Sequence, residues 1–265
     1  MSTTTGEGHY RFADVVRSEW TKFVSLRSTR WILVGFLVTG LGLGITVAAV
    51  SGAAWDDPSA ETRANWDPTN NTLAGLIPGY LVIPVLGVLM MTSEHGTGAI
   101  RSTLAAVPRR HQVLLAKALV FGVLVLVVDL VVTFAAFLAG QQVQQVVSDA
   151  PHAALGQPGV LRALLLSGFF LPLMGVFGLG LGALVRRSGA AVAAYFGLAL
   201  VVPDLLLVLP GDLWRFGPIT ILANSITAAN VQPEFLHPSQ GFTVMALYAA
   251  AALGGGSLVL SRRDV

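Results

Sequence analysis

Long apolar stretches alternate with short polar connections along this chain. A helix needs about 20 apolar residues to cross roughly 30 Å of hydrocarbon, because it rises about 1.5 Å per residue. Stretches of this length occur at residues 31–50, 73–91, 113–139, 160–185, 189–209 and 241–260. The pattern therefore predicts an all-α polytopic membrane protein, with a single six-span transmembrane domain over residues 31–260.

The composition also indicates a membrane environment. Of the 265 residues, 54% are hydrophobic and only 11% are charged, and the mean hydropathy is +0.72. A soluble domain carries roughly a quarter charged residues, so this chain has too few charges to cover a surface in water. Its net charge of +2 does not indicate a nucleic-acid partner, and we expect none.

The basic residues predict which ends of the spans face the cytoplasm. With the N-terminus inside, all of the 16 Lys and Arg residues except Arg63, Arg162 and Arg215 fall in cytoplasmic segments. Cytoplasmic loops of membrane proteins carry such an excess. We therefore expect residues 1–30 and the tail 261–265 to be cytoplasmic. This topology depends on the narrow separation of the fourth and fifth spans, because merging them would move the C-terminus outside.

The N-terminal region lacks the central apolar segment of a cleavable signal peptide. Residues 10–27 instead predict an amphipathic helix, because apolar residues recur there at helical spacing. We expect this helix to lie in the headgroup plane against membrane lipid, with Trp20, Lys22 and Arg27 at the interface. Its apolar face comprises Phe12, Val15, Val16, Trp20, Phe23 and Leu26.

Motifs for enzymatic chemistry are absent from the sequence. The chain has no cysteine, which excludes disulfides, thiolate metal sites and cysteine nucleophiles. It also lacks a phosphate-binding loop, an H-E-x-x-H pair and a G-x-S-x-G elbow. We therefore expect no catalytic residues, no metal site and no cofactor bound directly by this chain.

Two carboxylates lie inside predicted spans, Asp129 in the third and Asp204 in the fifth. An ionisable group at membrane depth costs a few kcal/mol by insertion scales, so each calls for an explanation. One interpretation is a pathway-facing group or a proton relay. The other is a structural hydrogen bond to a neighbouring helix, and the sequence slightly favours it for both.

Prolines and glycines punctuate the spans. Pro78 and Pro84 make the second span the best candidate for a bent, pathway-lining helix, because proline removes a backbone hydrogen bond. The string Gly-Leu-Gly-Leu-Gly occurs at Gly40–Gly44 and again at Gly178–Gly182. Each copy contains the small-xxx-small spacing that lets membrane helices approach closely. The outer segment 218–231 is mildly apolar, and we expect it to fold back as a re-entrant or surface helix.

The polar loop at residues 92–112 is the most informative segment. Gly96 and Gly98 are expected to end the second span, and residues 99–107 predict a short helix that Pro108 stops. Glu94 has possible partners in Arg101, in Arg109 or in a basic group of another protein. A short helix with an apolar face in such a loop is typical of a segment that binds a groove on another protein.

This layout resembles the six-span permease subunit of bacterial ABC transporters of the type-2 exporter class, most closely the actinobacterial members. The resemblance covers nearly the whole chain, and three parts carry it. They are Arg17-Ser18-Glu19-Trp20-Thr21-Lys22 with Leu26-Arg27-Ser28-Thr29-Arg30, the stretch from Thr92-Ser93-Glu94 through Lys117, and the later spans rich in small residues.

The resemblance implies that residues 92–112 form a coupling loop, which seats in a groove of a separate cytoplasmic ATPase. ATP and Mg would then be bound on that partner subunit. It also implies a second permease copy or a sister permease, and a location in the bacterial plasma membrane. The family often has Thr directly after the glycine, whereas this chain has Ala99 there. The family pattern falls on Glu94, Gly98, Leu104, Pro108, Arg109 and Lys117, and we add Arg101 to the predicted coupling surface.

The sequence leaves two other functions open. One is a non-transporting membrane scaffold or self-protection protein bound to an ATPase, in which the loop would look the same. The other is a proton-coupled secondary transporter that uses Asp129 and Asp204. The absence of an inverted repeat and of paired broken helices disfavours the second alternative.

Overall fold

The computed structural model describes residues 11–55, 59–98 and 110–262. These residues form helices and their connections, without a strand among them. Six of the helical segments are long and apolar enough to cross a membrane, so the predicted multi-pass helical architecture is confirmed. The spans are α2 (Arg27–Ala53), α4–η1–α5 (Pro68–Leu73, Ala74–Leu76, Ile77–Thr97), α7 (Arg110–Val147), α8 (Val160–Val185), α9–η2–α10 (Ser188–Phe196, Gly197–Val201, Val202–Leu206) and α12 (Pro238–Arg262).

Four shorter helices join or flank the spans. The N-terminal helix α1 (Phe12–Ser25) leads directly into α2, because Leu26 alone is extended between them. The other short helices are α3 (Ala60–Ala64), η3 (Leu213–Phe216) and α11 (Pro218–Ser225). Thus a helix does form within the segment 218–231, and it lies against α12 and α8.

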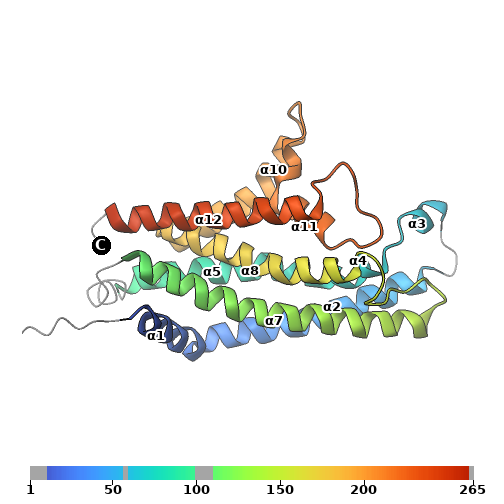
Figure 1. Ribbon diagram of the computed structural model, residues 1–265, viewed down its shortest axis with the longest axis horizontal. Helices are drawn as coiled ribbons and strands as arrows, with labels where there is room; N and C mark the ends of the chain where they lie inside the picture. The colour runs from blue at the N-terminus through green and yellow to red at the C-terminus, as the bar shows by residue number, and fades with distance from the viewer. Residues whose placement is uncertain (1–10, 56–58, 99–109, 263–265) are drawn as a thin grey trace, which may run out of the picture.

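The helices run roughly side by side, and α1 lies at the same end of the bundle as the C-terminal end of α12 (Figure 1). This end also collects the cationic residues Lys22, Arg30, Arg110, Arg186 and Arg262. Arg63 in α3 and Arg162 near the start of α8 belong to the opposite end. The described part of the chain is therefore as asymmetric in charge as the sequence indicates, and the cytoplasmic orientation of the basic end stays a prediction.

Helix α8 is the central element of the bundle. It packs against α5 on one side and α12 on the other, and it is the most buried span. Glycines make both contacts possible, because a Cβ on Gly178 would overlap the carbonyl group of Pro84 and one on Gly180 would lie 2.6 Å from the Ala252 methyl group. The close helix approach predicted for Gly178–Gly182 is thus confirmed.

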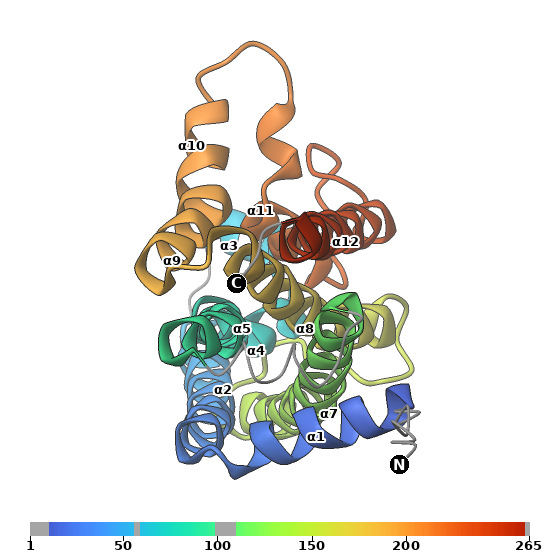
Figure 2. The same ribbon diagram turned by 90° about the vertical axis from the view of Figure 1, so that its left-hand side faces the viewer.

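Several spans are interrupted. A 3-10 turn at Ala74–Leu76 breaks the second span just before Pro78, while Pro84 lies inside α5. The second span is therefore irregular before Pro78, while its predicted bend and pathway-lining role stay predictions. The fifth span is also irregular, because the five-residue π-helix η2 separates α9 from α10. Beyond it, α10 and the following loop stand away from the bundle (Figures 1 and 2).

Asp67 joins two distant segments at the end of the bundle opposite α1. Its Oδ1 caps α4 by accepting hydrogen bonds from the backbone N–H groups of Thr69 and Asn70, both at 3.0 Å. Its Oδ2 accepts from the backbone N–H groups of residues 228, 229 and 230 at 2.8, 2.9 and 3.4 Å. Five donors satisfy this buried carboxylate, so Asp67 fixes the segment after α11 to the start of the second span.

Candidate functional site

A cluster of four charged side chains lies where α1, α5 and α7 meet. Lys117 of α7 is at its centre, with its Nζ 2.6 Å from Glu19 Oε2 of α1 and 2.6 Å from Glu94 Oε1 of α5. Lys22 of α1 approaches the same carboxylates, at 2.7 Å from Glu19 Oε1 and 3.4 Å from Glu94 Oε1. We refer to Glu19, Lys22, Glu94 and Lys117 as the ion cluster.

Helical spacing on α1 explains how the cluster forms. Val15, Glu19 and Phe23 are buried at intervals of four residues, so they share the face of α1 that packs on α7. Phe23 meets Phe121 edge to face, with ring centroids 5.7 Å apart. Since Phe121 lies one turn beyond Lys117, the aromatic contact fixes α1 in the register that brings Glu19 to Lys117.

The position of Glu94 also calls for a cationic partner. It lies in the last turn of α5, which ends at Thr97, and the carbonyl end of a helix disfavours a negative charge. Lys117 supplies the compensating charge from the first turns of α7. The pair therefore joins the two helices on either side of the connection that contains residues 99–109.

The cluster is neutral as a whole and largely buried. The side chains of Glu19 and Lys117 are each 1% exposed, that of Glu94 is 15% exposed, and that of Lys22 is 40% exposed. Burial lowers the pKa of Lys22, but the carboxylates of Glu19 and Glu94 outweigh it and raise that pKa above 10.5. Two carboxylates thus face two ammonium groups, as a buried ionic group requires.

A cavity of about 370 Å³ adjoins the cluster. Its walls include all four charged residues together with Ser93 and Met90. Among the described residues, Glu94 Oε2 has no hydrogen-bond partner although it is buried. The cavity therefore lies beside a carboxylate with one buried oxygen that has no partner among the described residues.

Further polar contacts join the helix ends nearby. Arg110 of α7 and Arg186, which follows α8, donate hydrogen bonds to the carbonyl groups of Leu260 and Val259, each at 3.0 Å. These carbonyls belong to the last turns of α12, where intrahelical donors run out. The Ser188 hydroxyl donates to Thr92 Oγ1 at 2.8 Å and links α9 to α5. This end of the bundle therefore behaves as one connected unit.

The predicted coupling residues fall partly within the structure. Glu94 lies in the ion cluster and pairs with Lys117 and Lys22. Gly98 ends α5 with a left-handed φ of +73°, a conformation that favours glycine. Gly96 lies inside α5, so only one of the two glycines predicted to end the span does so. The remaining predicted residues, Arg101, Leu104, Pro108 and Arg109, lie outside the described residues, as does the predicted helix over 99–107.

Sequence reasoning missed Glu19 as a site residue. The available signal was its spacing, since it lies midway between Val15 and Phe23 on the apolar side of α1. The predicted interfacial residues are at the surface, with Trp20 44% exposed and Arg27 exposed at the start of α2. Lys22 has an additional role that its position on the polar face does not reveal, because it is part of the ion cluster.

The structure does not bring the two intramembrane carboxylates together. Asp129 is completely buried in α7 and accepts one long hydrogen bond from the Thr133 hydroxyl at 3.5 Å. Asp204 is exposed on α10, which stands away from α7 (Figure 2). Within the described ranges, no group of three or more His, Asp or Glu residues gathers in a metal-binding arrangement.

The ion cluster is therefore the candidate functional site, because it joins three helices around the connection that the sequence singled out. No protein-family model matches this chain, and no curated protein matches it significantly.

Proposed function

We propose that this protein is the membrane-spanning permease subunit of an ATP-driven ABC exporter in a bacterial plasma membrane. It works as a dimer, with a second copy or a sister permease, and a separate cytoplasmic ATPase binds ATP and Mg. The observation that carries the proposal is Lys117 bridging Glu94 and Glu19. This bridge clamps together the ends of the two helices that flank residues 99–109.

The ion pairs of Lys117 with Glu94 and Glu19 would let a displacement of the α5–α7 connection move several helices together. The connection between α5 and α7 would bind the ATPase, and a displacement of it would be passed to both helices and to α1 as one body. A rigid joint matters here because a flexible one would absorb the displacement. The ATPase moves the spans only if it binds the two permease conformations with different affinities.

The basic end of the bundle is the cytoplasmic end in this proposal. It carries the ion cluster, the arginines that hold the end of α12, and the α5–α7 connection. Anionic headgroups would also attract α1 through its basic residues, with Trp20 at the lipid interface. The ATPase would therefore dock on the face of the bundle that is built from α1 and the ends of the spans.

The test is to reconstitute the chain with its ATPase in vesicles and to measure ATP hydrolysis and substrate flux together. Glu94→Ala is expected to leave hydrolysis within about twofold of wild type and to lower flux at least tenfold, because the joint loosens. Glu61→Ala, on the exposed helix α3, is the matched control and keeps flux unchanged. Arg101→Glu is expected to act like Glu94→Ala, and full flux in both variants would remove the coupling role. Vesicles in which wild type binds the ATPase but moves no substrate would favour the scaffold alternative.

The buried Asp129 favours a proton-coupled transporter as the second candidate. In that case flux would follow an imposed proton gradient without ATP, and Asp129→Asn would abolish it. The exposed position of Asp204 on α10 does not support a relay between the two carboxylates. We expect Asp129→Asn to retain ATP-driven flux, because the asparagine side chain keeps a hydrogen-bond acceptor toward Thr133.

A further inference from the structure

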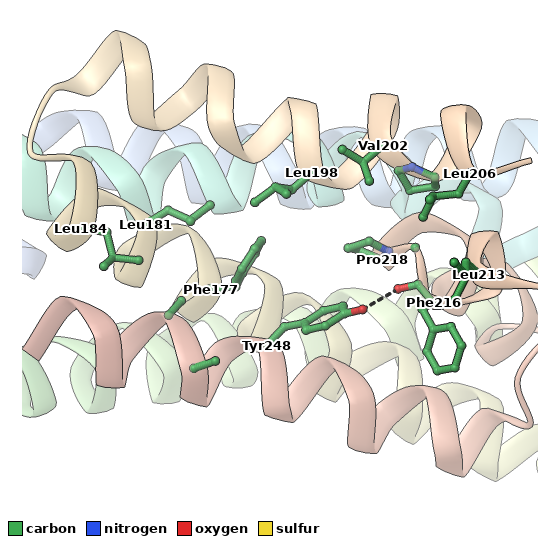
Figure 3. Close-up of a pocket in the computed structure, with 14 residues that line it drawn as sticks. Phe177, Leu181, Leu184, Leu198, Val202, Leu206, Leu213, Phe216, Pro218 and Tyr248 are labelled. Carbon is green, nitrogen blue, oxygen red and sulfur yellow. Dashed lines mark hydrogen bonds between the residues drawn. The ribbon is translucent and has the colours of Figure 1, made fainter. Parts of the chain in front are cut away.

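A pocket of about 330 Å³ lies at the start of α2. A larger pocket, of about 420 Å³, lies between α8, the fifth span and α12, and its walls are apolar. The Tyr248 hydroxyl in the larger pocket donates a hydrogen bond to the Phe216 carbonyl oxygen at 3.0 Å (Figure 3). Apolar walls do not identify a ligand, whereas the pocket on α2 presents two positive charges. We refer to it as the arginine pocket, and it is lined by Arg27, Arg30, Trp31 and Val34.

Helical spacing brings the four lining residues to one face of α2. They occupy positions i, i+3, i+4 and i+7, which lie close together on the surface of a helix. The extended residue Leu26 turns the chain between α1 and α2, and the two helices meet at the edge of the bundle (Figure 2). Helix α2 is also among the least buried spans. The arginine pocket therefore faces the surroundings of the protein and not its core.

The two arginines present uncompensated positive charge. Both side chains are exposed, and within residues 11–55, 59–98 and 110–262 neither forms an ion pair. The first turn of α2 contains no acidic residue. Arg30 donates a hydrogen bond from Nη2 to the Ser25 carbonyl oxygen at 3.5 Å, which leaves its other N–H groups to a ligand. Two guanidinium groups in one pocket favour an anion whose oxygens accept paired hydrogen bonds, as those of phosphate do.

The pocket crosses the boundary between the polar and the apolar sequence. Arg27 and Arg30 precede the apolar stretch that begins at residue 31, whereas Trp31 and Val34 belong to it. Exposed apolar side chains continue along this face, since Trp31, Val34 and Val38 are 73%, 50% and 61% exposed. Tryptophan is enriched where lipid headgroups meet hydrocarbon. The helix rises about 10 Å from Arg27 to Val34, so an apolar wall follows the charges directly on the hydrocarbon side.

A phospholipid has the same order of groups, with a phosphate followed by acyl chains. We propose that the arginine pocket binds the phosphate of one anionic phospholipid, whose acyl chains lie along Val34 and Val38. A soluble phosphate would use the arginines but not the apolar wall, and an acidic surface of a cytoplasmic protein would not reach that wall. A zwitterionic lipid brings an ammonium group toward the two guanidinium groups and is disfavoured. The inference rests on the membrane architecture and not on the transport function.

Native mass spectrometry of the full-length protein in detergent micelles tests this site. The protein is titrated with phosphatidylglycerol and, separately, with phosphatidylethanolamine, which carries the same phosphate and an additional ammonium group. The first phosphatidylglycerol is expected to bind about fivefold more tightly or better, because a basic residue near an anionic headgroup contributes about that factor. Equal affinity of wild type for the two lipids would overturn the proposal.

Two double variants with the same loss of charge locate the binding. Arg27→Gln with Arg30→Gln should lower the affinity for the first phosphatidylglycerol by about tenfold or more. Arg17→Gln with Arg187→Gln is the matched control, because both arginines are exposed and do not line the pocket, and its affinity should stay within about twofold of wild type. Equal losses in the two variants would show a general attraction to basic residues and refute the pocket. Unchanged affinity in the pocket variant would also refute it and leave these arginines to a protein partner.

A third variant separates a lipid from a soluble anion. Trp31→Ala keeps both arginines and removes part of the apolar wall, so the affinity for phosphatidylglycerol should fall by about threefold or more. Trp20→Ala is its control, because Trp20 is 44% exposed on α1 and does not line the pocket. Full affinity in Trp31→Ala, or displacement of the lipid by millimolar glycerol phosphate, would indicate a site for a soluble phosphate and overturn the lipid assignment.

Discussion

Replacing Lys117 by methionine removes the central charge of the ion cluster while keeping a similar side-chain volume. Removing one partner of a buried ion pair typically costs about 3–5 kcal/mol, because the other charge is left uncompensated. Here Glu19 keeps Lys22 at 2.7 Å, but the Lys22 side chain is 40% exposed and its effect is weakened by solvent. We therefore expect Lys117→Met to destabilise the protein by about 2–4 kcal/mol.

A double-mutant cycle measures the pairing directly. Lys117→Met, Glu19→Gln and the double variant are unfolded reversibly in mixed micelles, and their free energies of unfolding are compared. The double variant should cost less than the sum of the two single variants by about 1–3 kcal/mol, because it removes both members of the pair at 2.6 Å. Arg63→Met, on the exposed helix α3, should change stability by at most about 0.5 kcal/mol.

Two results would refute this reasoning. Additive costs in the cycle would mean that Lys117 and Glu19 are adjacent but do not stabilise each other. A stable Lys117→Met protein, equal to Arg63→Met in its free energy of unfolding, would mean that the cluster does not hold α1 against α7. In either case the joint proposed to transmit force would lack an energetic basis.

Three further predictions concern other parts of the molecule. Asp67→Ala should lower the free energy of unfolding by about 2–4 kcal/mol, because it removes both the cap of α4 and the hydrogen bonds that hold residues 228–230. The rate of proteolysis near residue 230 should rise by a corresponding factor. Gly178→Ala should lower the free energy of unfolding by about 1–3 kcal/mol, since the added methyl group overlaps the Pro84 carbonyl group. The control Gly254→Ala meets open space and should be neutral or slightly stabilising. Thermal unfolding of both variants measures the difference. The pKa of Lys22 is raised in the folded protein, so its contribution to stability is present below pH 10.5 and is lost as pH rises through the higher folded pKa. The stability of Lys22→Gln should therefore depend less on pH in the alkaline range than that of wild type. An identical pH dependence in both proteins would contradict this.

The sequence alone determined the number and approximate position of the spans. Hydrophobic length is a local property, because each span must satisfy its own backbone within the membrane. Local chemistry also indicated the end of α5 at Gly98 and the close approach at Gly178. The ends of the spans were less well predicted, since α7 runs 38 residues, longer than the hydrocarbon requires. It packs against α1 and α4 as well as against other spans.

Only the tertiary structure decided which charged residues meet. Glu19 and Lys117 are separated by 98 residues, and no local pattern specifies that α1 docks on α7 in the register that pairs them. The same holds for the two intramembrane carboxylates, because the packing of each helix buries Asp129 and leaves Asp204 exposed. Only the structure shows that α10, beyond the π-helix η2, stands away from the bundle. These features depend on how helices pack, which is set by many weak contacts between distant residues rather than by the hydrophobic pattern of any one segment.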